Sequence, residues 1–138
     1  MHSSPHVLVI DDDVVTADTY QQMLRLEGFT VSVATNAVDG LDTADRVQPD
    51  AIVADLRMPL VNGLEFLRRL RSRATTAATP VAIVTGDYLL DDATAAALRT
   101  LGATLKFKPL WLEDLVALTH ELLEQSAQAC EPADAVAV

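Results

Sequence analysis

The sequence predicts an α/β fold in which five βα units form a doubly wound parallel sheet. Short apolar runs of strand length recur about every twenty-five residues, and segments with helical spacing of apolar residues lie between them. Runs such as 7–10 and 51–54 are apolar at successive positions, which is typical of strands covered on both faces. This alternation favours parallel strands with right-handed crossovers and a layer of helices on each side.

The five expected strands are short and consist mostly of β-branched and aliphatic residues. Because ligands of open parallel sheets bind beyond the carboxyl ends of the strands, the residues directly after each run are the candidates for function. In chain order the runs are 7–10, 30–34, 51–54, 80–85 and 105–107.

Helices are expected between these strands and after the last one. Tyr20, Met23 and Leu24 recur at helical spacing before Gly28, which predicts a helix stop. Residues 125–138 have no such periodicity, and we expect them to form a disordered tail after a single folded domain of residues 1–124. The other predicted helices are marked by Leu64, Leu67 and Leu70 after Asn62-Gly63, by residues 91–101 before Gly102, and by the leucines from Leu112 to Leu123.

Composition and charge exclude several classes of protein. The 138 residues suffice for one ordinary domain, and a hydrophobic content of 50% can fill its core. The formal net charge of -10 disfavours direct binding to nucleic acid. No apolar run approaches the ~20 residues of a membrane span, the first residues lack the features of a signal peptide, and the single cysteine, Cys130, requires no oxidising compartment. We therefore expect a cytoplasmic protein that does not bind membranes.

Acidic residues directly follow the first and third predicted strands. Asp11, Asp12 and Asp13 come after the first, and Asp55 comes after the third. If these strands are neighbours, the carboxylates converge on one pocket, where their mutual repulsion requires a cation. Mg²⁺ fits this position because it takes carboxylate and water oxygens without histidine or cysteine. The first group of aspartates also fits a helix N-cap and first turn, which is our interpretation of Asp13.

Polar residues also close the fourth and fifth predicted strands. Thr85 ends the fourth before Gly86, and Lys108 follows the fifth before Pro109. Taken with the acidic residues, these positions make the sequence resemble the receiver domain of bacterial response regulators, the phospho-accepting half of two-component signalling. The resemblance covers about residues 6–124 and is carried by Asp11-Asp12, by Asp55-Leu56-Arg57-Met58-Pro59 with Gly63 downstream, by Thr85-Gly86 and by Lys108-Pro109.

The resemblance implies a flavodoxin-like fold with strand order 2-1-3-4-5. It makes Asp55 the nucleophile that takes a phosphoryl group. It also implies that Mg²⁺ is bound by Asp12, Asp55 and the backbone carbonyl of Arg57, with Asp11 acting largely through a bound water. Lys108 would then pair with the phosphoryl oxygens, and the Thr85 hydroxyl would turn toward them.

The partners implied by the resemblance are proteins. A histidine kinase or histidine phosphotransferase would supply the phosphoryl group, and an output protein, whose identity the sequence does not give, would respond to it. The chain would be a stand-alone receiver, a monomer or a weak homodimer. It would catalyse its own phosphorylation and dephosphorylation, and would not be a turnover enzyme on an external substrate.

Two other functions stay open on the sequence. A pseudo-receiver would bind a partner without ever taking phosphate. A haloacid-dehalogenase-like phosphatase also uses an aspartate at a strand end, but it needs a second aspartate two residues later, where this chain has Arg57.

One departure from the family pattern bears on how a signal would leave the site. The family usually carries an aromatic residue shortly before the lysine of the fifth strand, and this chain has Leu105 there. We therefore expect the loop from Thr85 to Leu90, which contains Gly86 and Tyr88, to carry the conformational switch.

Overall fold

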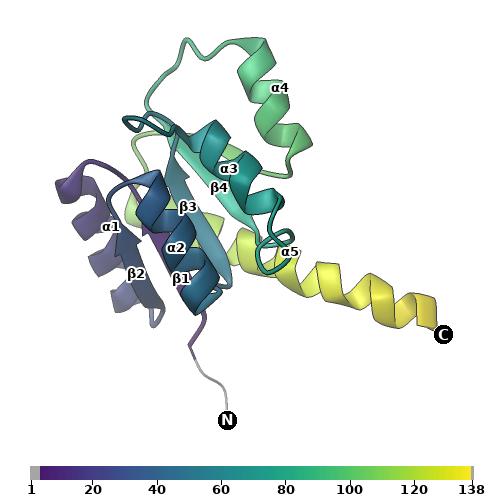
Figure 1. Ribbon diagram of the computed structural model, residues 1–138. Helices are drawn as coiled ribbons and strands as arrows, with labels where there is room; N and C mark the ends of the chain where they lie inside the picture. The colour runs from purple at the N-terminus through teal and green to yellow at the C-terminus, as the bar shows by residue number, and fades with distance from the viewer. Residues whose placement is uncertain (1–3, 138) are drawn as a thin grey trace.

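The computed structural model describes residues 4–137, with side-chain environments for residues 4–126, and in this part of the chain five strands alternate with five helices (Figure 1). Each strand predicted from the sequence is present, with its ends shifted by at most one residue. The elements are β1 His6–Ile10, α1 Val14–Leu26, β2 Thr30–Ala34, α2 Ala37–Val47, β3 Ala51–Asp55, α3 Gly63–Arg71, β4 Val81–Thr85, α4 Asp92–Thr100, β5 Thr104–Phe107 and α5 Leu112–Ala137.

The strands form one parallel sheet in the order β2-β1-β3-β4-β5, which confirms the predicted topology. The central pair, β1 and β3, is in a register that places Ile10 opposite Ala54. The next residues along the chain, Asp11 just after β1 and Asp55 at the end of β3, therefore lie at the same level of the sheet. The register of the sheet thus brings two distant parts of the sequence to one place.

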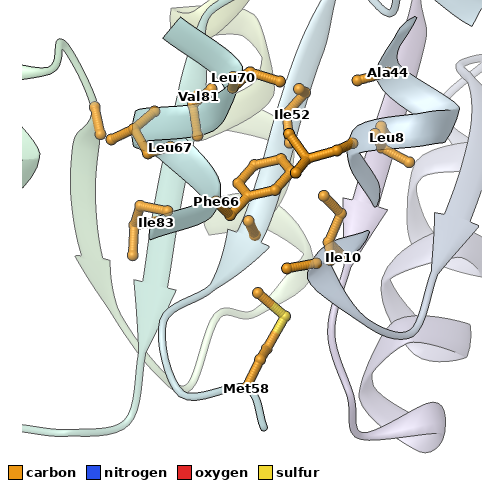
Figure 2. Packing of buried hydrophobic residues seen from close by; sticks show 14 of the residues in the cluster. Leu8, Ile10, Ala44, Ile52, Met58, Phe66, Leu67, Leu70, Val81 and Ile83 are labelled. Atoms are coloured by element: carbon orange, nitrogen blue, oxygen red, sulfur yellow. The ribbon is translucent and has the colours of Figure 1, made fainter. Parts of the chain in front are cut away.

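Helices cover both faces of the sheet and enclose two hydrophobic clusters. One cluster lies under α2, α3 and α4, and Figure 2 shows the Phe66 ring within it among side chains of the strands, including Leu8 and Ile52. The other lies under α1 and α5 and contains Val7 and Val9. Successive residues of β1 thus point to opposite faces and are buried on both. Each large buried side chain contributes roughly 1.5–3 kcal/mol.

Local signals in the sequence set where several helices begin and end. The carboxylate of Asp13 accepts a hydrogen bond from the amide of Val15 at 3.1 Å, which confirms its role as an N-cap. Gly28 and Gly102 have φ angles of 94° and 82° just after α1 and α4. This left-handed conformation ends a helix and favours glycine, as the sequence predicts for both positions.

The last helix is longer than expected. It continues to Ala137, whereas the sequence analysis expected disorder from residue 125. That expectation rested on apolar periodicity, which reports packing against a core. Helix formation itself depends on backbone propensity, and alanine, the best helix former, recurs from Ala127 to Ala137. In Figure 1 the end of α5 extends beyond the sheet. Val138 lies outside the described residues.

Among the helices of residues 4–137, none combines the length and the apolar character that crossing a bilayer requires.

Candidate functional site

The carboxylates at the carboxyl ends of β1 and β3 meet at one edge of the sheet. Asp11, Asp12 and Asp55 each place one carboxylate oxygen within 4.8 Å of the others. Asp11 is 3% exposed and Asp55 is 7% exposed, whereas Asp12 lies at the surface. The structure therefore brings together the acidic residues that the sequence analysis singled out.

Lys108 supplies a positive charge to this cluster from the end of β5. Its Nζ atom lies 3.1 Å from Oδ2 of Asp11 and 3.5 Å from Oδ1 of Asp55. Burial acts to lower the pKa of Lys108, but the hydrogen bond to Asp11 and the charges of both aspartates outweigh burial and leave the pKa raised. The ammonium group therefore stays protonated beside the carboxylates.

Asp55 lies beside two other carboxylates, those of Asp11 and Asp12. Burial raises the pKa of its carboxyl group, the charge of Asp11 raises it further, and Lys108 offsets only part of the effect. Three carboxylates thus share one ammonium group, and the surplus negative charge favours a bound cation. Closely spaced carboxylate oxygens at a partly open edge are the ligand set that Mg²⁺ prefers, so the residues present fit this ion.

The loop after β3 holds Asp55 in place through Gly63. The amide of Gly63 donates a hydrogen bond of 2.8 Å to the carbonyl of Leu56. A Cβ atom at position 63 would lie 2.6 Å from the backbone oxygen of Asp55 and 2.9 Å from Cα of Leu56. Glycine is therefore required here by the close approach of two backbone segments, a reason that the sequence motif did not reveal.

Thr85 is fully buried at the end of β4. This strand is the neighbour of β3, whose last residue is Asp55. Its hydroxyl oxygen accepts a hydrogen bond of 3.0 Å from the amide of Asp87, and its backbone carbonyl accepts one of 2.8 Å from the amide of Lys108. The hydroxyl is therefore tied to the loop that follows β4.

Arg57 follows Asp55 by two residues, and its guanidinium group forms a hydrogen-bonded ion pair with Asp87. The metal-ligand role implied for the backbone carbonyl of Arg57 stays a prediction. The sequence analysis did not single out Asp87. The sequence does contain a signal for it. Asp87 comes two residues after Thr85, just as Arg57 comes two residues after Asp55, and the two side chains have opposite charges.

The chain matches a known protein family over most of its length. The family model described as the response regulator receiver domain matches residues 7–120. The chain belongs to this family. The match covers every site residue described above, and it confirms the resemblance found from the sequence.

Curated relatives of this receiver domain are named as regulators. It is 36% identical over 137 residues to the transcriptional regulatory protein PrrA of Mycobacterium leprae, covering 99% of this chain and 58% of the relative. It is 36% identical over 130 residues to the transcriptional regulatory protein TrcR of Mycobacterium tuberculosis, covering 93% and 49%. The chain thus spans about half the length of the curated relatives it matches.

Solved structures similar to this receiver domain have the same fold. The chemotaxis protein CheY4 of Vibrio cholerae superposes with a TM-score of 0.80 at 25% identity, covering 87% of this chain and 99% of that one. A CheY-like receiver domain protein of Methanospirillum hungatei gives a TM-score of 0.84 at 24% identity, covering 92% and 99%. The architecture is therefore that of a receiver domain of two-component systems.

Proposed function

We propose that this receiver domain accepts a phosphoryl group on Asp55 from a phosphohistidine protein, and that the modification changes its binding to a protein partner. The observation that supports this most is the acidic cluster, in which the oxygens of three carboxylates lie within 4.8 Å of one another and Lys108 lies within 3.5 Å of two of them. Such a site binds a divalent cation and a phosphoryl group together.

In the proposed transfer, a carboxylate oxygen of Asp55 attacks phosphorus in line with the bond to the donor histidine. The new O–P bond forms as the N–P bond breaks, and the imidazole keeps the electron pair and takes up a proton. Lys108 is close enough to move from the carboxylates to the phosphoryl oxygens, and the Thr85 hydroxyl would donate to another of them. Bound Mg²⁺, held by Asp12, Asp55 and the Arg57 carbonyl with Asp11 behind a water, would supply charge neutralisation.

The distribution of exposed apolar side chains supports a protein as donor and as output partner. Among residues 4–126, nearly all the exposed large apolar side chains lie at the carboxyl edge of the sheet or in the loops and first helical turns that follow its strands. Apolar surface gathered around a polar site is typical of a protein interface. These residues are Val14, Val15, Val38, Leu60, Tyr88, Leu89, Phe107, Trp111 and Leu112, and the exception is Leu26.

The proposed donor is a histidine kinase or histidine phosphotransferase. The output partner is a protein, and the net charge of -10 makes direct contact of this chain with nucleic acid unfavourable. The relatives named as transcriptional regulators are about twice as long as the matched segment, and their output is not part of this proposal. The proposal also includes the cytoplasmic location that is expected from the sequence.

Intact-mass analysis after incubation with phosphoramidate, a small-molecule phosphodonor, tests the function. With Mg²⁺ we expect one added phosphoryl group on the native chain, and with EDTA we expect none. Asp55→Asn should remain unmodified because an amide does not attack phosphorus, while Asp18→Asn, which changes an exposed residue of α1, should be modified like the native chain. Full modification of Asp55→Asn would refute the assignment, and an unmodified native chain would favour the pseudo-receiver.

A further inference from the structure

Two loops at the edge of the site are joined by one ion pair. Arg57 lies in the loop after β3 and Asp87 in the loop after β4, and these strands are neighbours with Asp55 opposite Val84. Each member of the pair comes two residues after a proposed site residue, Asp55 or Thr85. The guanidinium of Arg57 is therefore held by a carboxylate that belongs to the other loop.

Asp87 is ordered by several contacts besides Arg57. Its Oδ1 atom accepts a hydrogen bond of 3.0 Å from the amide of Leu89, and its own amide donates to the Thr85 hydroxyl oxygen at 3.0 Å. The hydrogen bond from Arg57 is the main reason that the pKa of Asp87 is lowered. Asp87 is thus a charged, oriented acceptor whose backbone also restrains Thr85.

Arg57 is bound much less firmly. Its side chain is 64% exposed, and among the hydrogen bonds and ion pairs of the described residues its only partner is Asp87. An ion pair exposed to solvent in this way contributes little to stability. The guanidinium can therefore leave Asp87 at little cost when a stronger anion lies near.

A phosphoryl group on Asp55 would be such an anion. It brings about one additional negative charge and three acceptor oxygens to a position two residues from Arg57. Guanidinium groups bind phosphate oxygens through paired hydrogen bonds that are shorter and stronger than neutral ones. We infer that Arg57 is a second cationic ligand of the phosphoryl group, beside Lys108. In the unmodified protein the Arg57 guanidinium pairs with Asp87, and it moves to the phosphoryl group when Asp55 is modified.

This exchange would release the loop after β4 at the same time. Without Arg57, Asp87 loses its charged partner, and its amide becomes freer to leave the Thr85 hydroxyl oxygen. The hydroxyl of Thr85 can then turn to the phosphoryl group. The inference rests on the proposed function, since it requires a phosphoryl group on Asp55. It gives a role to the side chain of Arg57, for which the resemblance implies a role only through the backbone carbonyl.

Calorimetric titration with beryllofluoride in saturating Mg²⁺ tests the exchange, because beryllofluoride on Asp55 stands in for the tetrahedral phosphoryl group. Arg57→Ala should weaken binding about tenfold, the loss of one charge-assisted interaction. Asp87→Asn should strengthen binding about threefold because it frees Arg57, while its amide oxygen can still accept from Leu89. In the double variant Arg57→Ala/Asp87→Asn, the affinity should equal that of Arg57→Ala alone.

Arg68→Ala is the matched control, because it removes the same charge from an exposed position on α3 where the arginine pairs with Glu65. It should bind beryllofluoride like the native chain. Native affinity in Arg57→Ala would overturn the inference. So would an equal gain from Asp87→Asn with and without Arg57, since Asp87 would then act by direct repulsion. If the native chain did not bind beryllofluoride with Mg²⁺, the proposed function itself would fail, which distinguishes the two.

Discussion

Asp55 combines two properties that oppose each other in the folded protein. Its carboxylate must be ionised to attack phosphorus, yet burial and the neighbouring Asp11 favour its protonated form and raise its pKa. Lys108 relieves only part of this conflict. The residue that we propose to carry the function therefore lowers the stability of the metal-free protein at neutral pH.

This conflict predicts how stability depends on pH. Because the pKa of Asp55 in the folded chain is above its ordinary value of 3.8, its contribution to stability is fully present below that value and is lost as pH rises through the folded-state pKa. In metal-free buffer, Asp55→Asn should be more stable than the native chain at pH 7, and this advantage should shrink toward pH 4. Urea unfolding across this range measures it. A constant difference between the two proteins at all pH values would contradict the argument.

Gly63 gives a second prediction for a single residue. Gly63→Ala should lower the free energy of unfolding by about 1–3 kcal/mol, because the new Cβ atom would meet the backbone of Asp55 and Leu56. It should also weaken beryllofluoride binding, since relief of this contact displaces Asp55. Gly86→Ala is the control because nothing lies within 4 Å of its added Cβ atom. Equal melting temperatures of Gly63→Ala and the native chain would show that the close approach is not restrictive.

Among the elements, the loop between β4 and α4 is tied to the edge strand β5 by an aromatic contact. The rings of Tyr88 and Phe107 stack with centroids 5.5 Å apart and an interplanar angle of 19°. The Tyr88 hydroxyl also donates to the backbone carbonyl of Lys108. Leu105 is half-buried and packs against the cluster under α3. The loop itself thus supplies the aromatic side chain that connects it to β5.

Hydrogen exchange tests the expectation that this loop carries the switch. On adding beryllofluoride and Mg²⁺, the amides of residues 86–92 should change their protection, because Thr85 and Arg57 both exchange contacts with this loop for contacts with the anion. Tyr88→Ala should exchange faster in this segment before any addition, whereas Tyr88→Phe, which keeps the ring, should change it less. Protection changes confined to β5 around Leu105 would refute this route.

For the whole molecule, twenty acidic and ten basic side chains leave a net charge of -10, and the acidic cluster concentrates part of it at one edge of the sheet. A cation that binds only the folded chain stabilises it by mass action, by about 2.7 kcal/mol at a hundred times its Kd. The stability of the whole domain should therefore report on occupancy of the proposed metal site.

Thermal unfolding gives the corresponding prediction. Mg²⁺ should raise the Tm of the native chain by several degrees more than NaCl at the same ionic strength. Asp12→Asn should remove most of this increase and should raise the Tm in EDTA, because it removes one of several crowded like charges. A lower Tm of Asp12→Asn in EDTA would contradict the crowding argument, and an equal effect of NaCl would indicate general screening.

Features that depend on neighbouring residues could be predicted from the sequence. Asp13 caps α1 and Gly28 ends it because these interactions involve residues a few positions away. The placement of Asp11, Asp55, and Lys108 at one edge was also predictable, since parallel strands all end on the same side of the sheet. The length of α5 was not, because residues 125–137 lack apolar periodicity and helix formation there depends on backbone propensity.

The sequence by itself thus determined the fold, the family and the set of side chains at the carboxyl edge. Only the tertiary structure decided which of these side chains touch. The pairing of Arg57 with Asp87, the stacking of Tyr88 on Phe107 and the contact that requires Gly63 each join separate segments. The physical reason is that spacing along a chain sets local hydrogen bonds, whereas contacts between loops depend on strand register and on how the helices pack against the sheet.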